Sequence, residues 1–182
     1  MVAPNPQPVA KTTRQRVQKP LQWITGALAA FGLVVVLMLV VQTPTQEYSF
    51  STVNLAGDKV SLADYRGHVV MLNFWATWCP PCKAEMPVIE STYQQYKDSG
   101  FVVLAVNNAE RSDQVTSFAS QYKLTFPVLL DYSADIQQQF GIKGYPTSLF
   151  LDAKGKVYAT HQGMVTADQL ESYIKNGLQR ST

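Results

Sequence analysis

The sequence predicts an α/β fold with a mixed central sheet, helices on both faces and an N-terminal β-hairpin extension, preceded by one transmembrane helix. Three observations predict this class. Nearly continuous apolar runs alternate with amphipathic segments between residues 69 and 140, which is typical of strands alternating with helices. A hairpin pattern follows near the C-terminus and makes the sheet mixed. A long uncharged apolar run lies near the N-terminus of the 182-residue chain.

The first 41 residues predict a tail and a membrane anchor. Residues 1–20 are rich in Pro, Gln and Thr, carry four basic and no acidic side chains, and are expected to form a disordered cytoplasmic tail. Residues 21–41 contain an uncharged run from Trp23 to Val41. As a helix this run spans about 28 Å, close to the hydrocarbon thickness of a bilayer. We therefore expect a transmembrane signal anchor over 21–41, since a buried core helix is not apolar on every face.

The charge distribution predicts that the rest of the chain is exported. A basic flank keeps the tail inside, so the residues after Val41 lie outside the cytoplasm. A cleaved signal peptide is the alternative, but the run exceeds the usual apolar region of about 7–15 residues and no small-x-small site follows it. Residues 42–47 are a short linker that keeps the domain over 48–182 near the membrane. All 13 acidic residues lie beyond the tail, so no nucleic-acid partner is indicated.

The exported domain begins with a hairpin and a buried strand. Residues 48–62 alternate loosely around a turn signal at 56–59, which predicts a β-hairpin. Residues 63–67 are expected to form a helical turn closed by a glycine. Residues 69–75 are nearly all apolar and predict a strand buried on both faces.

The remaining elements follow from apolar spacing and from turn and cap residues. Two helix–strand units are predicted: a helix over 82–96, a strand over 101–106, a helix over 112–122 and a strand over 126–130. The last elements are a short helix over 133–140 stopped by Gly141, a hairpin of strands 147–151 and 156–160, and a helix from the N-cap Thr166 to 176–177. Residues 107–110 follow a strand on the side where α/β sheets place their sites, and are interpreted as a loop.

Cys79 and Cys82 are the only cysteines, and a Cys-x-x-Cys pair has three main uses. A structural zinc needs about four ligands, whereas no second pair exists and the two histidines are isolated, so no metal site is predicted. A static disulfide is possible in an exported domain. However, a bridge across two residues closes a very short loop, which gains little stability.

Reversible thiol chemistry is the favoured use. Cys79 follows a buried strand and stands at the start of a helix, where unpaired N–H groups and the helix dipole stabilise a thiolate. Cys79 is therefore the predicted attacking sulfur, and Cys82 is the resolving thiol that expels the substrate from a mixed disulfide. Pro80 and Pro81 suit the first helical turn, where a missing N–H costs nothing. This chemistry needs no cofactor.

Residues 73–83 resemble the active-site segment of thioredoxins. Residues 62–70 and 82–87 are similar, more narrowly, to the TlpA/ResA branch, which comprises membrane-anchored, extracytoplasmic thioredoxin-like proteins of bacteria. Residues 141–147 resemble the loop of that family that carries a cis-proline opposite the redox pair. The match covers residues 48–178 and implies a thioredoxin-like fold for the exported domain at the bacterial cytoplasmic membrane.

The resemblance implies roles for individual residues. Cys79 is the nucleophile and Cys82 the resolving cysteine of a redox-active disulfide. A cis bond before Pro146 leaves the backbone of Tyr145 free to pair with an extended substrate segment beside Cys79, and Trp78 shields the sulfur. The residues expected to contact substrate are Trp78, Pro80, Pro81, Tyr145 and Pro146.

One departure from ordinary thioredoxins concerns proton handling. Thioredoxins carry a buried Asp where this chain has Asn73, which cannot titrate. In the TlpA/ResA branch a Glu in the helix after the cysteines is assigned a comparable role, and Glu85 occupies that position. Its alternative interpretation is an acid that favours the start of a helix. We expect Glu85 to support catalysis.

The predicted function is a membrane-anchored extracytoplasmic thiol-disulfide oxidoreductase that acts on protein disulfides. The Pro-Pro dipeptide offers no side-chain donor to stabilise the thiolate, which favours a reductase supplied by a transmembrane electron-donor protein. The resemblance implies the haem-site cysteines of apocytochrome c as a candidate client. The alternatives are a peroxiredoxin-like thiol peroxidase and, outside enzymes, a redox sensor or metallochaperone using the same pair.

Overall fold

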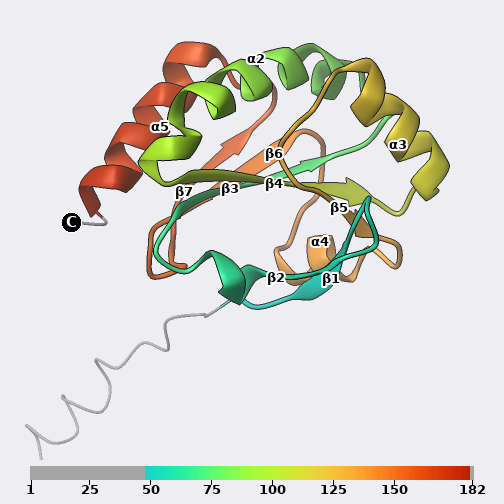
Figure 1. Ribbon diagram of the computed structural model, residues 1–182, viewed down its shortest axis with the longest axis horizontal. Helices are drawn as coiled ribbons and strands as arrows, with labels where there is room; N and C mark the ends of the chain where they lie inside the picture. The colour runs from blue at the N-terminus through green and yellow to red at the C-terminus, as the bar shows by residue number, and fades with distance from the viewer. Residues whose placement is uncertain (1–47, 181–182) are drawn as a thin grey trace, which may run out of the picture. The chain divides into compact units, whose positions relative to one another are not determined.

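The computed structural model describes residues 48–180 (Figure 1). The predicted tail over 1–20, anchor over 21–41 and linker over 42–47 lie outside the described residues. Among residues 48–180, no helix has both the length and the apolar character that a membrane crossing requires.

One seven-stranded mixed sheet organises the domain, in the order β2-β1-β5-β4-β3-β6-β7. The strands are β1 Ser51–Asn54, β2 Lys59–Ser61, β3 Val69–Trp75, β4 Phe101–Asn108, β5 Val128–Asp131, β6 Thr147–Leu151 and β7 Val157–Gln162. The three central strands β3, β4 and β5 run parallel, while the strands outside them pair antiparallel. The predicted mixed sheet and N-terminal hairpin are confirmed.

Two hydrophobic cores lie on the two faces of the sheet, and the larger one is covered by three helices. Helix α2 (Pro80–Tyr96) connects β3 to β4, and α3 (Ser112–Gln121) connects β4 to β5. Because these crossovers step across the sheet in one direction and share one hand, both helices cover the same face. The C-terminal helix α5 (Ala167–Arg180) joins them there (Figure 1). Each helix contributes side chains to this core, for example Met86 of α2, Phe118 of α3 and Ile174 of α5.

The opposite face has a smaller cover. It is formed by the short helix α4 (Asp135–Gln139), the single turn η1 (Leu62–Tyr65) and the segment before β1 (Figure 1). Phe140 is the centre of this cover, because the ring of Tyr48 stacks on it at 4.3 Å and Phe74 of β3 packs beneath it. Helices and loops thus cover both faces, as predicted.

The structure corrects two predicted boundaries. Helix α2 begins at Pro80, with Cys79 as its N-cap, rather than at Cys82. Helix α5 does not stop at Gly177 but continues to Arg180. Gly177 is a close-packing position there, because a Cβ atom would lie 2.4 Å from the Tyr158 hydroxyl and 2.6 Å from a methyl group of Val69.

Candidate active site

The two cysteines form a disulfide at the edge where the parallel strands end. Strand β3 is buried along its whole length, and the chain leaves it through a short loop into α2. Cys79 and Cys82 are joined by an S–S bond of 2.07 Å, and the backbone N–H of Cys82 donates to the Sγ atom of Cys79 over 3.3 Å. Pro80 and Pro81 occupy the first helical positions, where no N–H donor is lost.

The two sulfurs differ in access. Cys79 keeps 4% of its surface exposed and borders an open cleft, whereas Cys82 has none exposed. A substrate sulfur therefore reaches Cys79 first, and Cys82 is reached only from inside the protein. This asymmetry matches an attacking and a resolving cysteine.

An apolar cleft of about 370 Å³ opens beside Cys79. Trp78 is 61% exposed at its rim, and its ring meets that of Tyr145 edge to face at 5.9 Å. The Tyr145–Pro146 bond is cis, as the resemblance implied. The hydroxyl of Tyr145 donates to the side chain of Gln137 in α4, which fixes the ring. The lining residues are Trp78, Cys79, Pro80, Pro81, Lys143, Gly144 and Tyr145.

The structure brings most of the predicted substrate-contacting residues together and separates one. Trp78, Pro80, Pro81 and Tyr145 line the cleft. Pro146 is buried and does not line it. Lys143 adds a positive charge to the cleft wall that the sequence patterns did not indicate.

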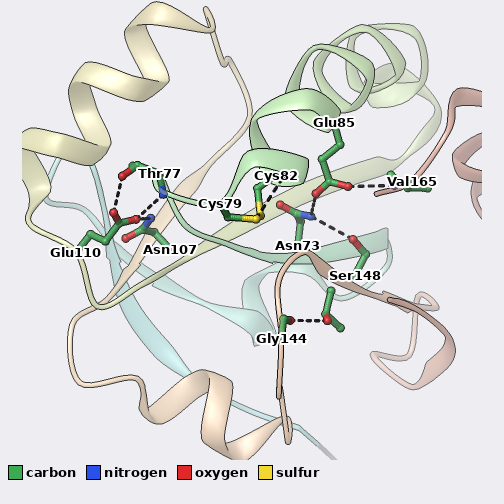
Figure 2. Close-up of a disulfide and its surroundings, with 11 residues drawn as sticks. Asn73, Thr77, Cys79, Cys82, Glu85, Asn107, Glu110, Gly144, Ser148 and Val165 are labelled. Carbon is green, nitrogen blue, oxygen red and sulfur yellow. Dashed lines mark hydrogen bonds between the residues drawn. A yellow bond between two sulfur atoms is a disulfide. The ribbon is translucent and has the colours of Figure 1, made fainter. Parts of the chain in front are cut away.

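Glu85 belongs to α2 and is fully buried, and its carboxylate points towards Asn73 (Figure 2). One carboxylate oxygen accepts from the Asn73 side-chain amide at 2.8 Å, and the other accepts from the backbone N–H of Val165 at 3.1 Å. Burial disfavours the charged form and raises the pKa of Glu85 to about 7, although both hydrogen bonds act in the opposite sense. A carboxylic acid that titrates near neutral pH suits proton transfer to or from a thiol.

A second glutamate lies on the other side of the disulfide, in the loop after β4 (Figure 2). Glu110 accepts from the backbone N–H of Thr77 at 2.7 Å, from the Thr77 hydroxyl at 2.5 Å and from the Asn107 amide at 2.7 Å. Thr77 stands two residues before Cys79. Glu110 therefore anchors the loop that leads into Cys79, a role missed in interpreting 107–110 as a loop alone. Its place after a central parallel strand was the available signal.

Comparisons with known proteins agree with this geometry. Residues 41–176 match the Redoxin family model. Thiol-disulfide oxidoreductase ResA of Bacillus thuringiensis is 40% identical over 127 residues, which cover 70% of this chain and 73% of the relative. Thioredoxin-like protein YneN of Bacillus subtilis is 43% identical over 137 residues, covering 74% and 79%. The crystal structure of StoA from Bacillus subtilis superposes with a TM-score of 0.62 at 33% identity, covering 71% of this chain and 98% of that one.

Proposed function

This chain belongs to the redoxin family and is a thiol-disulfide oxidoreductase with a thioredoxin-like fold, and we propose that it is a membrane-anchored enzyme that reduces protein disulfides outside the cytoplasm. One observation carries the proposal: the Cys79–Cys82 disulfide is buried except where its outer sulfur borders an apolar cleft. The anchor is the apolar segment over 21–41, which lies outside the described residues.

The proposed cycle begins with the dithiol. The Cys79 thiolate attacks a client disulfide and forms a mixed disulfide, and one client thiol leaves with a proton. The Cys82 thiol loses its proton and attacks the Cys79 sulfur, which releases the second client thiol and closes the Cys79–Cys82 disulfide. The client gains two electrons and two protons. A transmembrane dithiol donor then restores the enzyme.

The cleft favours a protein segment as the substrate. Its wall is aromatic and apolar around Cys79, and it is larger than a peroxide requires. In this proposal an extended client chain lies beside the Tyr145–Pro146 bond and pairs with the backbone of Tyr145, and the exposed ring of Trp78 packs against it. These contacts hold a client cysteine near Cys79 and give little specificity for the client's amino-acid sequence.

Glu85 is proposed to handle the proton of the resolving thiol. Cys82 must be deprotonated before it attacks, and Glu85 lies one helical turn further along α2. Its pKa of about 7 lets it accept a proton in one half of the cycle and return it in the other.

The reducing direction rests on what surrounds Cys79. The hydrogen bond to its sulfur comes from the backbone N–H of Cys82, and Pro80 and Pro81 add no donor. A thiolate with little support makes the dithiol a better electron donor. The candidate client is the Cys-x-x-Cys haem site of apocytochrome c, which must be reduced before haem attachment.

Trapping mixed disulfides tests the function. A Cys82→Ala variant of the full-length chain, expressed in cells, is expected to accumulate covalent complexes with its client proteins. The matched Cys79→Ala variant is expected to form none, because the attacking sulfur is gone. A Cys82→Ala chain that captures no protein contradicts the proposal.

The reduction potential tests the direction. Equilibration of the full-length chain with glutathione is expected to give a value nearer that of thioredoxin, about −270 mV, than that of DsbA, about −120 mV. Peroxide consumption that is lost in a Cys79→Ser variant, without reduction of insulin, would instead favour the peroxidase alternative.

A further inference from the structure

The Asn73 amide has one atom without a partner in the buried centre of the site. Asn73 is fully buried in β3, and its Nδ2 group donates to Glu85 and, over 3.1 Å, to the Ser148 hydroxyl of β6. Its Oδ1 atom is also buried and accepts no hydrogen bond from residues 48–180. A buried acceptor without a donor costs free energy, so in the disulfide state the Oδ1 atom lacks a hydrogen bond that would stabilise the fold.

Strand alternation turns Asn73 towards helix α2. Met71 and Trp75 lie in the core under α2, and every second residue of a strand faces the same side, so Asn73 faces α2 as well. Cys82 and Glu85 stand one turn apart on α2 and are both fully buried. Figure 2 shows the Asn73 side chain between Glu85 and the disulfide, with its oxygen on the side of the sulfurs.

Reduction changes what the inner sulfur offers. In the disulfide the Cys82 sulfur carries no hydrogen. Two electrons and two protons convert the pair into two thiols, and Cys82 then has a buried S–H group, which is a hydrogen-bond donor. We propose that Asn73 is a positioning residue of the dithiol state: its Oδ1 accepts the Cys82 S–H while its Nδ2 holds Glu85.

One amide then connects the resolving thiol to the carboxylate. The 2.8 Å contact of Nδ2 with Glu85 gives the amide its orientation, so its oxygen has a defined direction, while Ser148 of the neighbouring strand only accepts the second N–H of the same group. The S–H of Cys82 is held on the side of Glu85 until the resolving attack begins. This inference rests on the dithiol cycle of the proposed function, but not on its direction or its client.

The S–H stretching band in the infrared spectrum tests the contact directly. In a Cys79→Ser background of the full-length chain, Cys82 is the only thiol. Its band is expected at the lowered frequency of a hydrogen-bonded S–H. Asn73→Leu is expected to move it to the free-thiol position, whereas Asn73→Asp, which keeps an acceptor, retains the low position. Ser148→Ala removes a different partner of Asn73 and is expected to leave the band unchanged.

The redox equilibrium gives a second measurement. With both cysteines present, Asn73→Leu is expected to shift the dithiol–disulfide equilibrium against glutathione about tenfold towards the disulfide, which is about 30 mV. The Ser148→Ala variant is expected to leave that equilibrium in place.

Several results would overturn the inference. One is a Cys82 S–H band at the free-thiol position in the Cys79→Ser chain that retains Asn73. This result overturns the inference even if Asn73→Leu fails to fold. An unchanged band in Asn73→Leu, or an equal redox shift in Ser148→Ala, does so as well. A chain that shows the Asn73 effect but captures no client overturns the proposed function alone.

Discussion

Two glutamates flank the disulfide, and the same side chain is used in opposite ways. Glu85 is fully buried and shares its two hydrogen bonds between an amide and one backbone N–H. Glu110 is half-buried and takes three hydrogen bonds, two of them from the loop residue Thr77 (Figure 2). Full burial with two donors leaves the Glu85 charge poorly stabilised, and its pKa rises to about 7.

The difference in burial and donors is what we expect between a proton-handling group, the role proposed for Glu85, and an anchor. A carboxylate that has lost its water and gained only two donors changes its charge near neutral pH, which a thiol exchange reaction can use. A carboxylate that accepts three short hydrogen bonds is fixed in position. The bonds to Glu110 therefore hold the segment that leads to Cys79. Proximity to the sulfurs alone does not distinguish these roles, but the number of donors and the burial do.

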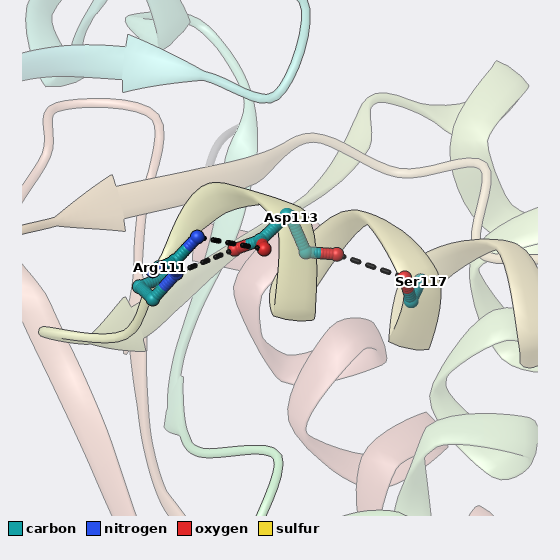
Figure 3. A network of polar contacts seen from close by, with 3 residues as sticks. All are labelled: Arg111, Asp113 and Ser117. Carbon is teal, nitrogen blue, oxygen red and sulfur yellow. Dashed lines mark hydrogen bonds and ion pairs between the residues drawn. The ribbon is translucent and has the colours of Figure 1, made fainter.

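The largest expected effect comes from removing the anchor. Glu110→Ala leaves the Thr77 N–H and the Asn107 amide without their acceptor, so the free energy of unfolding of the oxidised chain is expected to fall by about 4 kcal/mol. Urea unfolding of the full-length chain measures it. The matched control is Asp113→Ala: Asp113 pairs with Arg111 in solvent at the start of α3 (Figure 3), where an ion pair contributes about 0–1 kcal/mol. Equal losses in the two variants would contradict the anchoring role.

The next effect is the pH dependence that Glu85 gives to stability. Its pKa is about 7 in the folded chain and 4.5 when exposed, so between these values the folded state binds more protons than the unfolded state. The contribution of Glu85 to stability is therefore expected to be lost as pH rises from about 4.5 through 7, by about 3 kcal/mol in total, and this group contributes no further change well above pH 7.

A Glu85→Gln variant isolates that contribution. Unfolding free energies of the oxidised chain measured across the same pH range are expected to lack this fall, because the amide does not titrate. A Glu85→Gln chain with an unchanged slope would assign the titration to another group.

The sequence was sufficient for the parts of the site that are local. Cys79, Cys82 and Glu85 fall within seven consecutive residues: the two cysteines were identified from their spacing at a helix start, and Glu85 from its position in the motif that resembles the family. The cis bond at Pro146 came from a short loop motif that resembles a known family, and it is present. In these cases the neighbours that determine the geometry are also neighbours in the sequence.

The rest depends on contacts between distant segments. The bond from Thr77 to Glu110 spans 33 residues and that from Asn73 to Ser148 spans 75. Both require the register of β3 with β4 and with β6. Strand β3 is buried on both faces, so it lacks the apolar–polar alternation that would set this register. The helix end predicted at Gly177 was wrong for a related reason. The close approach of Tyr158 to Gly177 is a tertiary contact, so a glycine that packing requires resembled one that ends a helix.

A kinetic difference is expected to follow the same division between the two glutamates. Glu85→Gln is expected to slow the reduction of insulin by the reduced chain about tenfold near pH 7, because the resolving thiol loses its proton acceptor. The rate of the wild-type chain is expected to depend on pH with an apparent pKa of about 7, and the variant to lack that dependence. A Glu110→Gln chain that loses the same pH dependence would contradict the assignment of roles.

The smallest expected effect comes from Thr77, because Thr77→Val breaks one of the three bonds that Glu110 accepts. The variant removes the hydroxyl donor but keeps the backbone N–H and the shape of the side chain, so the loss in unfolding free energy is expected to be about 1 kcal/mol. A double-mutant cycle with Glu110→Ala isolates the pair, since Thr77→Val should cost almost nothing once Glu110 is absent. Full additivity of the two losses would mean that Glu110 stabilises the fold without holding Thr77, and the anchor would then have to act through Asn107 alone.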